Sequence, residues 1–291
     1  MKPDDLTKSS SSPDQWDFEL TPKTGWLDLQ LRELWHYRDL TLLFVRRDFV
    51  ARFKQTILGP AWFVIQPLLT TLMFTIIFGN IAQISTDGLP KILFYLSGNI
   101  LWLYFSECLS LCSNTFTANA GIFGKVYFPR LVVPVSIVIS QVLTFGLQFV
   151  FFLCFMGYYA ASGADFHPNS ILLLLPVLVL LMAGMGLGLG IIFSSLTTKY
   201  RDMRFLLDFG VRLAMYATTV IYPLSSLPSK YRLLILANPV TPIIETFRYG
   251  FLGAGSFSWA YLGYSAAFTV IVMVIGVFMF TKIERTFMDT V

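Results

Sequence analysis

Charged side chains are scarce in the apolar parts of this sequence, and the few that occur there are the first candidates for chemistry. Glu107 lies in an apolar segment, where burying a carboxylate is costly and is usually linked to a partner or to a water-filled cavity. Glu245 and Arg248 are close together in a second such segment, and Asp208 and Arg212 in a third. Because opposite charges at these spacings share one helix face, each pair is either a structural ion pair or part of a polar path.

The rest of the sequence holds no arrangement typical of a catalytic or metal site. His36 and His167 have no triad or ligand pattern around them, and the cysteines lie in apolar segments, where packing is their usual role. The stretch GMGLGLG, residues 184–190, lacks the Lys-Ser, Lys-Thr or later acidic residue of a nucleotide site. Its glycine spacing is instead typical of close helix packing in lipid. We predict a chain that is not an enzyme and binds no metal or cofactor itself.

The elements that must position these charges are membrane helices. Hydrophobic residues make up 55% of the chain and charged residues 13%, and the mean hydropathy is +0.67, which is membrane composition. Long uncharged intervals, at 55–86, 108–124, 131–164, 166–198 and 249–281, exceed what a soluble core absorbs. We expect an all-α membrane protein with six transmembrane helices, at about 60–79, 92–113, 131–157, 170–193, 205–222 and 260–280.

The positions of lysine and arginine orient this layout. Both termini fall on one side of the membrane, and that side carries most of the Lys and Arg residues, so the positive-inside rule predicts cytoplasmic termini. Residues 1–27 are polar and lack the apolar core of a signal peptide, and we expect a disordered cytosolic tail there. Residues 28–58 are predicted to form an amphipathic interface helix region, and residues 59–291 the six-span membrane domain.

The interface helix is predicted from its apolar stripe. Between Leu31 and Ile57, seven apolar residues fall within an arc of about 100° on a helix: Leu31, Leu34, Trp35, Leu42, Val45, Phe49 and Phe53. Arg38 and Arg52 also fall in this arc, so they either snorkel or mark a break near Asp39. Such a helix lies in the membrane interface with its cations near anionic head groups, and the alternative is a solvated helix packed on a soluble domain.

Two further segments are predicted to hold helices that do not span. The stretch NTFTANAGIFGKVYFPR, residues 114–130, suits a short cytoplasmic helix exposed to a partner, or a plain connector. Residues 223–259 are apolar but interrupted by prolines, and their two helical pieces, about 230–237 and 242–252, are too short to cross. We interpret them as two short re-entrant helices before the last span, with a folded external loop as the alternative. Interrupted helices are common along the substrate path of transporters.

Five stretches, taken together, resemble a known family. They are WHYRDLTLLFVRRDFVARFKQTILGPAWFVIQP (35–67), KVYFPRLVVPVS (125–136), KYRDMR (199–204), NPVTPIIETFRYGFLG (238–253) and ERTFMDTV (284–291). In order and spacing they resemble the membrane-spanning subunits of type-2 ABC exporters, specifically the permeases that export lipid-linked polysaccharides such as O-antigen. The set covers nearly all of the chain beyond about residue 27, and its specificity lies in the ordered combination.

This resemblance implies a multi-pass protein of the bacterial inner membrane that moves a polyprenyl-linked glycan out of the cytoplasm. It implies that two copies of the chain form a pore as a homodimer and that two separate ABC ATPase subunits, which hold ATP and Mg, dock beneath. The interface helix and the loop 114–128 would contact the ATPase, with Asn119, Phe123 and Lys125 as candidate coupling residues. Glu245 and Arg248 become candidates for a periplasmic gate. No nucleic acid is expected as a partner.

The resemblance also implies a pore lined partly by aromatic residues. Trp102, Tyr104, Phe105 and Glu107 are the candidates for that lining, since sugar faces stack on rings and hydroxyls seek polar groups; lipid-facing anchors are the alternative. Arg46, Arg47 and Arg52 are candidates for binding the diphosphate of the carrier, or else for anchoring to membrane lipid. Other functions left open are a type-2 exporter of teichoic acid, a drug or a small lipid, an autonomous channel or carrier, and a membrane-embedded enzyme.

Overall fold

The computed structural model describes residues 31–54, 56–126 and 128–287, and the tail predicted at 1–27 lies outside this part. The described chain is helical and contains no strand. Its helices are α1 (Leu31–His36), α2 (Arg38–Phe53), α3 (Trp62–Phe74), α4 (Lys91–Ser113), α5 (Thr115–Phe123), α6 (Val132–Ala161), α7 (Leu175–Lys199), α8 (Met203–Tyr216), α9 (Ser229–Leu236), α10 (Val240–Leu252) and α11 (Trp259–Phe287). Short 3₁₀ helices are η1 (Gly59–Ala61), η3 (Ser170–Leu174) and η4 (Leu224–Ser226), and η2 (Thr75–Ile81) is a π-helix.

Five segments of the described chain are long and apolar enough to cross a membrane. They are Gly59–Ile81, Lys91–Ser113, Val132–Ala161, Ser170–Lys199 and Trp259–Glu284, and they coincide with five of the six predicted spans. The prediction at 205–222 falls on α8, which has 14 residues. A helix of this length is about 21 Å long, against about 30 Å of hydrocarbon, so this segment is not confirmed as a span.

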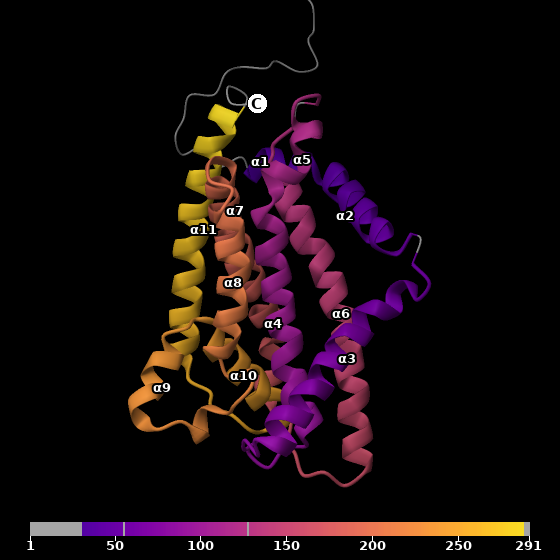
Figure 1. Ribbon diagram of the computed structural model, residues 1–291, viewed down its shortest axis with the longest axis vertical. Helices are drawn as coiled ribbons and strands as arrows, with labels where there is room; N and C mark the ends of the chain where they lie inside the picture. The colour runs from indigo at the N-terminus through magenta and orange to yellow at the C-terminus, as the bar shows by residue number, and fades with distance from the viewer. Residues whose placement is uncertain (1–30, 55, 127, 288–291) are drawn as a thin grey trace, which may run out of the picture.

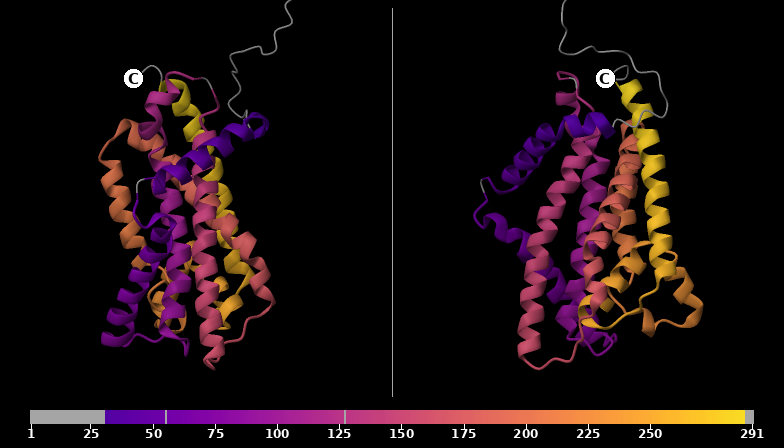
Figure 2. Two further views of the ribbon diagram at one scale, coloured as in Figure 1. Left: turned by 90° about the vertical axis from the view of Figure 1, so that its right-hand side faces the viewer. Right: turned by 180° about the vertical axis from the view of Figure 1, so that it is seen from behind.

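The long helices form a bundle with two distinct ends (Figure 1). α4 lies between α6 and α7, and α11 packs on α7. α1, α5 and the end of α11 lie at one end of the bundle, so the two ends of the described chain are on the same side, while α9 and α10 lie at the other end. The two views of Figure 2 show α2 set obliquely against the bundle, beside α6.

The glycines of α7 are the contact points that hold three helices together. A Cβ on Gly186 would lie 2.6 Å from Cys108 Cβ of α4, and a Cβ on Gly190 would lie 2.5 Å from Cys112 Cβ. Gly188 faces the other way, where a Cβ would lie 3.0 Å from the backbone of α11. The absence of side chains therefore lets the backbones of α4 and α11 approach α7 closely. The prediction that GMGLGLG serves helix packing is confirmed.

The predicted interface helix is divided into α1 and α2, which are separated at Tyr37. The inner face of α2 packs on the bundle through Phe44, Val45 and Phe49, whose ring lies 6.2 Å from that of Phe63. Its outer face exposes Leu42, Leu43 and Val50 together with Arg46. Only part of the predicted apolar stripe therefore faces the protein. The face of α2 that points away from the bundle is apolar and carries Arg46.

The short helix predicted within 114–130 is confirmed as α5. Phe116 stacks on Phe280 of α11 with ring centroids 4.5 Å apart, and Phe123 packs with Phe128, which in turn contacts Phe44 of α2. These aromatic rings belong to one buried cluster. The cluster joins α5 to α11 through Phe116 and Phe280, and to α2 through Phe128.

The predicted helical pieces within 223–259 are confirmed as α9 and α10, of eight and 13 residues. Almost every residue of α10 is buried, including Glu245 and Arg248. α10 packs against α4, α7, α11 and η3. It is therefore an internal element of this end of the bundle.

Candidate functional site

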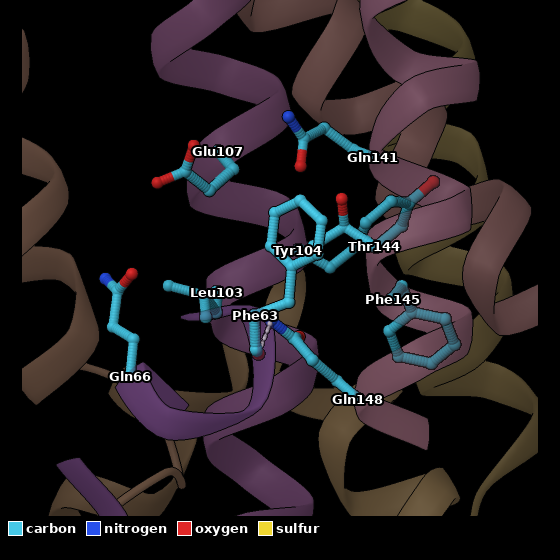
Figure 3. Close-up of a pocket in the computed structure, with 9 residues that line it drawn as sticks. All are labelled: Phe63, Gln66, Leu103, Tyr104, Glu107, Gln141, Thr144, Phe145 and Gln148. Atoms are coloured by element: carbon cyan, nitrogen blue, oxygen red, sulfur yellow. Dashed lines mark hydrogen bonds between the residues drawn. The ribbon is translucent and has the colours of Figure 1, made fainter. Parts of the chain in front are cut away.

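A polar cavity lies between α3, α4 and α6, all of which belong to candidate membrane spans (Figure 3). Tyr104 and Glu107 line it from α4, and glutamine, threonine and phenylalanine residues line it from α3 and α6: Phe63, Gln66, Gln141, Thr144, Phe145 and Gln148. Its volume is ≈ 90 Å³. At about 30 Å³ per water, it has room for about three water molecules, and polar side chains at such depth are costly unless they are hydrated or paired.

Helical spacing explains how these residues meet. On α6, Gln141, Thr144 and Gln148 follow one another at three- and four-residue steps, which places them on one face. Tyr104 and Glu107 share a face of α4 in the same way. Sequence reasoning singled out the two α4 residues and missed those of α6 and α3. The periodic polar residues within the apolar stretch 132–161 are the signal that indicates them.

Pro67 in the middle of α3 explains why glutamine is needed next to the cavity. Proline has no backbone N–H, so the carbonyl oxygen of Phe63, four residues earlier, loses its usual helical donor. Gln148 Nε2 of α6 donates to this carbonyl oxygen at 3.2 Å, as drawn in Figure 3. On the other side of the proline, Asn99 Nδ2 of α4 donates to Pro67 O at 3.1 Å and to Thr71 Oγ1 at 3.4 Å. The Gln148 side chain thus takes the place of the missing backbone donor, and Asn99 adds a further hydrogen bond to the span at this point.

We expect Gln148→Leu to destabilise the protein by about 1–3 kcal/mol, because the Phe63 carbonyl then loses the hydrogen bond from Gln148. The measurement is the free energy of unfolding in detergent. In a Pro67→Ala background, residue 67 regains its N–H and can bond Phe63 O itself, so the same leucine substitution should cost much less. Equal costs in both backgrounds would show that the Gln148 hydrogen bond does not serve the proline.

The four predicted lining residues fall on two faces of α4. Tyr104 and Glu107 border the polar cavity, whereas Trp102 and Phe105 line an apolar pocket of ≈ 350 Å³ on the side of α7, α8 and α11. The rings of Trp102 and Phe105 are 5.5 Å apart, and Tyr104 instead lies 5.3 Å from Phe145 of α6. The four predicted lining residues therefore form two separate pairs, and within one chain they do not line a single continuous surface.

Arg248 is a fully buried cation that joins three elements. Its Nε donates to Ser97 Oγ at 3.1 Å and its Nη2 donates to Phe94 O at 3.2 Å, both on α4. Nη2 also donates to Val220 O at 3.1 Å, and Nη1 donates to Thr219 O, in the turn after α8. The guanidinium carbon lies 3.8 Å from the centre of the Phe94 ring.

Glu245 is the charge partner of this arginine. Its Oε1 lies 3.7 Å from Arg248 Nη1, and both side chains are almost completely buried. Its other oxygen, Oε2, accepts a hydrogen bond from the backbone N of Ser256 at 3.0 Å. Glu245 also borders a pocket of ≈ 250 Å³ together with Asp87 and Arg232. The predicted pairing of Glu245 with Arg248 is confirmed, and a gating role stays a prediction.

Comparison with known proteins assigns the chain to a family. Residues 39–252, most of the chain, match the family model described as ABC-2 type transporter. The chain belongs to the ABC-2 type transporter family. It is 26% identical over 251 residues to the O-antigen export system permease protein RfbA of Klebsiella pneumoniae, covering 86% of this chain and 94% of that protein. It is 26% identical over 220 residues to RfbA of Myxococcus xanthus, covering 75% and 82%. It is 25% identical over 248 residues to the polysialic acid transport protein KpsM of Escherichia coli, covering 84% and 93%.

The arginines of the interface region differ in their surroundings in this ABC-2 type chain. Arg47 pairs with Asp48, with 2.8 Å between Nη2 and Oδ1, and its guanidinium lies 4.5 Å from the centre of the Phe44 ring. Arg46 is exposed on the outer face of α2. The placement of the Arg52 side chain lies outside the described part. Arg46 is therefore more available to a head group than Arg47, whose charge already has a partner.

The candidate coupling residues of this ABC-2 type chain also separate. Phe123 is buried in the aromatic cluster of α5, Lys125 is exposed, and Asn119 Nδ2 donates to Thr115 O within α5 at 2.9 Å. Just beyond them, Arg130 Nη1 donates to the backbone oxygen of Glu284 at 2.6 Å, which ties this loop to α11. Burial lowers the pKa of the Arg130 guanidinium, and the Glu284 carboxylate opposes that shift.

Proposed function

We propose that the chain is the membrane-spanning subunit of an ATP-driven exporter that moves polysaccharide across the bacterial inner membrane. The observation that carries this proposal is the similarity to permeases named for O-antigen export and polysialic acid transport, which extends over nearly the whole of those proteins. The family assignment supports an ATPase partner, on which ATP and Mg are bound. The cargo is a polyprenyl-linked glycan of O-antigen type.

The proposed membrane arrangement has six crossings with both termini in the cytoplasm. Five crossings are the long apolar segments, and the sixth is α8 extended by the turn 217–222, which returns the chain toward α9 and α10. α2 lies in the cytoplasmic interface with Leu42, Leu43 and Val50 in the acyl boundary and Arg46 at the head groups. α9 and α10 enter from the outer side as re-entrant elements, since neither is long enough to cross.

The proposed assembly is a pair of these chains above two ATPase subunits. α5 lies at the bundle end that holds the termini, and its exposed neighbour Lys125 is placed to contact an ATPase. Because α5 shares an aromatic cluster with α2 and α11, movement of the ATPase is transmitted to the interface helix and to the last span. At the other end, the Glu245 and Arg248 pair holds α10 against α4 and closes the outer exit until the helices rearrange.

The polar cavity supports a sugar cargo. Amides, a hydroxyl, a phenol and a carboxylate converge there beside the rings of Phe63 and Phe145. Sugars use both kinds of surface, since hydroxyls need hydrogen-bond partners and ring faces pack on aromatics. Tyr104 and Glu107 are therefore placed to contact a glycan or its hydrating waters, while Trp102 and Phe105 contact apolar material.

The experiment that tests this function is depletion of the chain in its native host, followed by fractionation of lipid-linked glycan between the two faces of the inner membrane. We expect accumulation on the cytoplasmic face. Wild-type chain should reverse it only when the ATPase partner can hydrolyse ATP. A normal glycan distribution after depletion would contradict glycan export and favour a drug or small-lipid cargo.

A further inference from the structure

An apolar groove runs along α8, between this helix and the rest of the bundle. Its walls come from five helices, α4, α7, α8, α10 and α11, and representative lining residues are Trp102, Phe105, Met185, Phe193, Leu207 and Phe268. The volume is ≈ 350 Å³, within the range of about 300–1,000 Å³ that is usual for ligand sites. Between Leu206 and Ala214, which both line it, α8 advances about 12 Å, so the groove is elongated along the helix axis.

One end of this groove carries unpaired positive charge. α7 ends at Lys199 and α8 begins at Met203, and the turn between them exposes Lys199, Arg201 and Arg204. Among the ion pairs of the described chain, none involves these three residues. On α8, the lining of the groove begins at Leu206, two residues after Arg204. The basic turn, residues 199–204, therefore lies next to this end of the groove. It contains a single acidic residue, Asp202.

The proposed membrane arrangement sets the depth of the groove. Lys199 is the last residue of the candidate span Ser170–Lys199, so in that arrangement the basic turn lies at the edge of the apolar layer and the groove lies within it. An amphiphile with one long apolar tail and a strongly anionic head matches this arrangement, because lysine and arginine bind phosphate oxygens by charge-assisted hydrogen bonds. A lipid with two acyl chains would leave one chain outside a single groove.

We propose that the groove binds the polyprenyl diphosphate carrier of the glycan, with the isoprenoid tail along α8 and the diphosphate at the basic turn. This inference rests on the proposed function and names a site for the carrier that differs from the interface helix. Arg47 of that helix is already paired with Asp48, whereas the cations of the basic turn have no such partner. Trp102 and Phe105 then contact the tail, and Tyr104 and Glu107 face the sugar side.

The first arm of the test fills the groove. The permease and its ATPase partner are placed in phosphatidylcholine nanodiscs with a diazirine-bearing polyprenyl diphosphate that carries no sugar, and labelled peptides are identified by mass spectrometry. Gly210 lines the groove, and a Cβ there would have no atom within 4 Å, so Gly210→Phe fits without a clash. We expect labelling of α7 and α8 peptides to fall about tenfold. Gly263→Phe, at an equally open glycine of α11 outside the groove, should leave labelling unchanged.

The second arm removes the charge. In a Lys199→Gln, Arg201→Gln, Arg204→Gln variant, we expect diphosphate labelling to fall about tenfold while labelling by the matching uncharged polyprenol stays the same. Lys230→Gln, an exposed cation at the other end of the bundle, is the matched control. Unchanged labelling in both Gly210→Phe and the triple variant would overturn the inference. Competition by two-chain phosphatidylglycerol as strong as by unlabelled polyprenyl diphosphate would also overturn it.

The two proposals can fail separately. Because the probe carries no glycan, absence of groove labelling in a protein that still exports glycan overturns the carrier site and leaves the function intact. A normal glycan distribution after depletion overturns the function, even when the probe labels the groove.

Discussion

Replacing Arg248 by methionine is expected to lower the free energy of unfolding of the permease by about 3–5 kcal/mol, the usual cost of breaking a buried ion pair on one side. The substitution leaves the Glu245 carboxylate buried without its cation, and it removes the donors of four hydrogen bonds, to Ser97, Phe94, Val220 and Thr219. The measurement is unfolding in mixed detergent, followed by the fluorescence of the chain's tryptophans.

A second variant separates loss of the network from loss of the charge balance. In Arg248→Met with Glu245→Gln, no uncompensated carboxylate is buried, so we expect part of the lost stability to return. Lys230→Met removes an exposed cation at the same end of the bundle and should change stability by less than about 0.5 kcal/mol. If Arg248→Met alone proves as stable as the wild type, α10 is not held to α4 by this side chain.

Leucine at Gly186 or Gly190 is expected to cost about 1–3 kcal/mol each, because neither site can accept a side chain without moving α4. The added Cβ would lie 2.6 Å from Cys108 Cβ in one case and 2.5 Å from Cys112 Cβ in the other, and the α4 backbone lies just behind. The separation of α4 from α7 should also reduce glycan export, since α4 carries both the cavity and the groove residues.

Gly146→Leu is the matched control for these variants. Gly146 is also a glycine within a long membrane helix, α6, but a Cβ there would have no atom within 4 Å. The same change should therefore leave stability and export near the wild-type values. Equal losses at Gly146 and at Gly186 would mean that leucine harms the helices for a reason other than close packing.

The fold could be predicted from the sequence wherever the hydropathy and the residue types of a segment determine its structure. The apolar stretches placed five of the spans, and the prolines around 223–259 indicated short helices there. The stretch at 205–222 shows the limit of that reasoning. Its apolar letters continue to Tyr222, yet α8 ends at Tyr216, and the carbonyl oxygens of Thr219 and Val220 accept from Arg248, far along the chain. Hydropathy cannot predict a hydrogen bond between residues so far apart in the sequence.

The candidate site was predicted only in part. Glu107 and the α4 aromatics were found, but helical rotation of about 100° per residue already separates Trp102 and Phe105 from Tyr104 and Glu107, and the structure places these pairs on different surfaces. The polar residues of α6 at three- and four-residue steps were a second signal that was missed. Gln66 has no such signal, because its place beside the cavity depends on how α3 leans against α4 and α6.

Composition and residue spacing were enough to predict a helical membrane protein, the positions of most of its helices and the glycines that let those helices pack closely. These features follow from the character of neighbouring residues, each of which acts on its own segment. Which groups lie together is visible only in the folded chain: Gln148 bonds the Phe63 carbonyl, Arg248 bonds the turn after α8, and the basic turn lies close to the start of the apolar groove on α8. This is because a buried polar group needs a hydrogen-bond partner in space, and for Gln148 and Arg248 partners lie on elements far away along the chain.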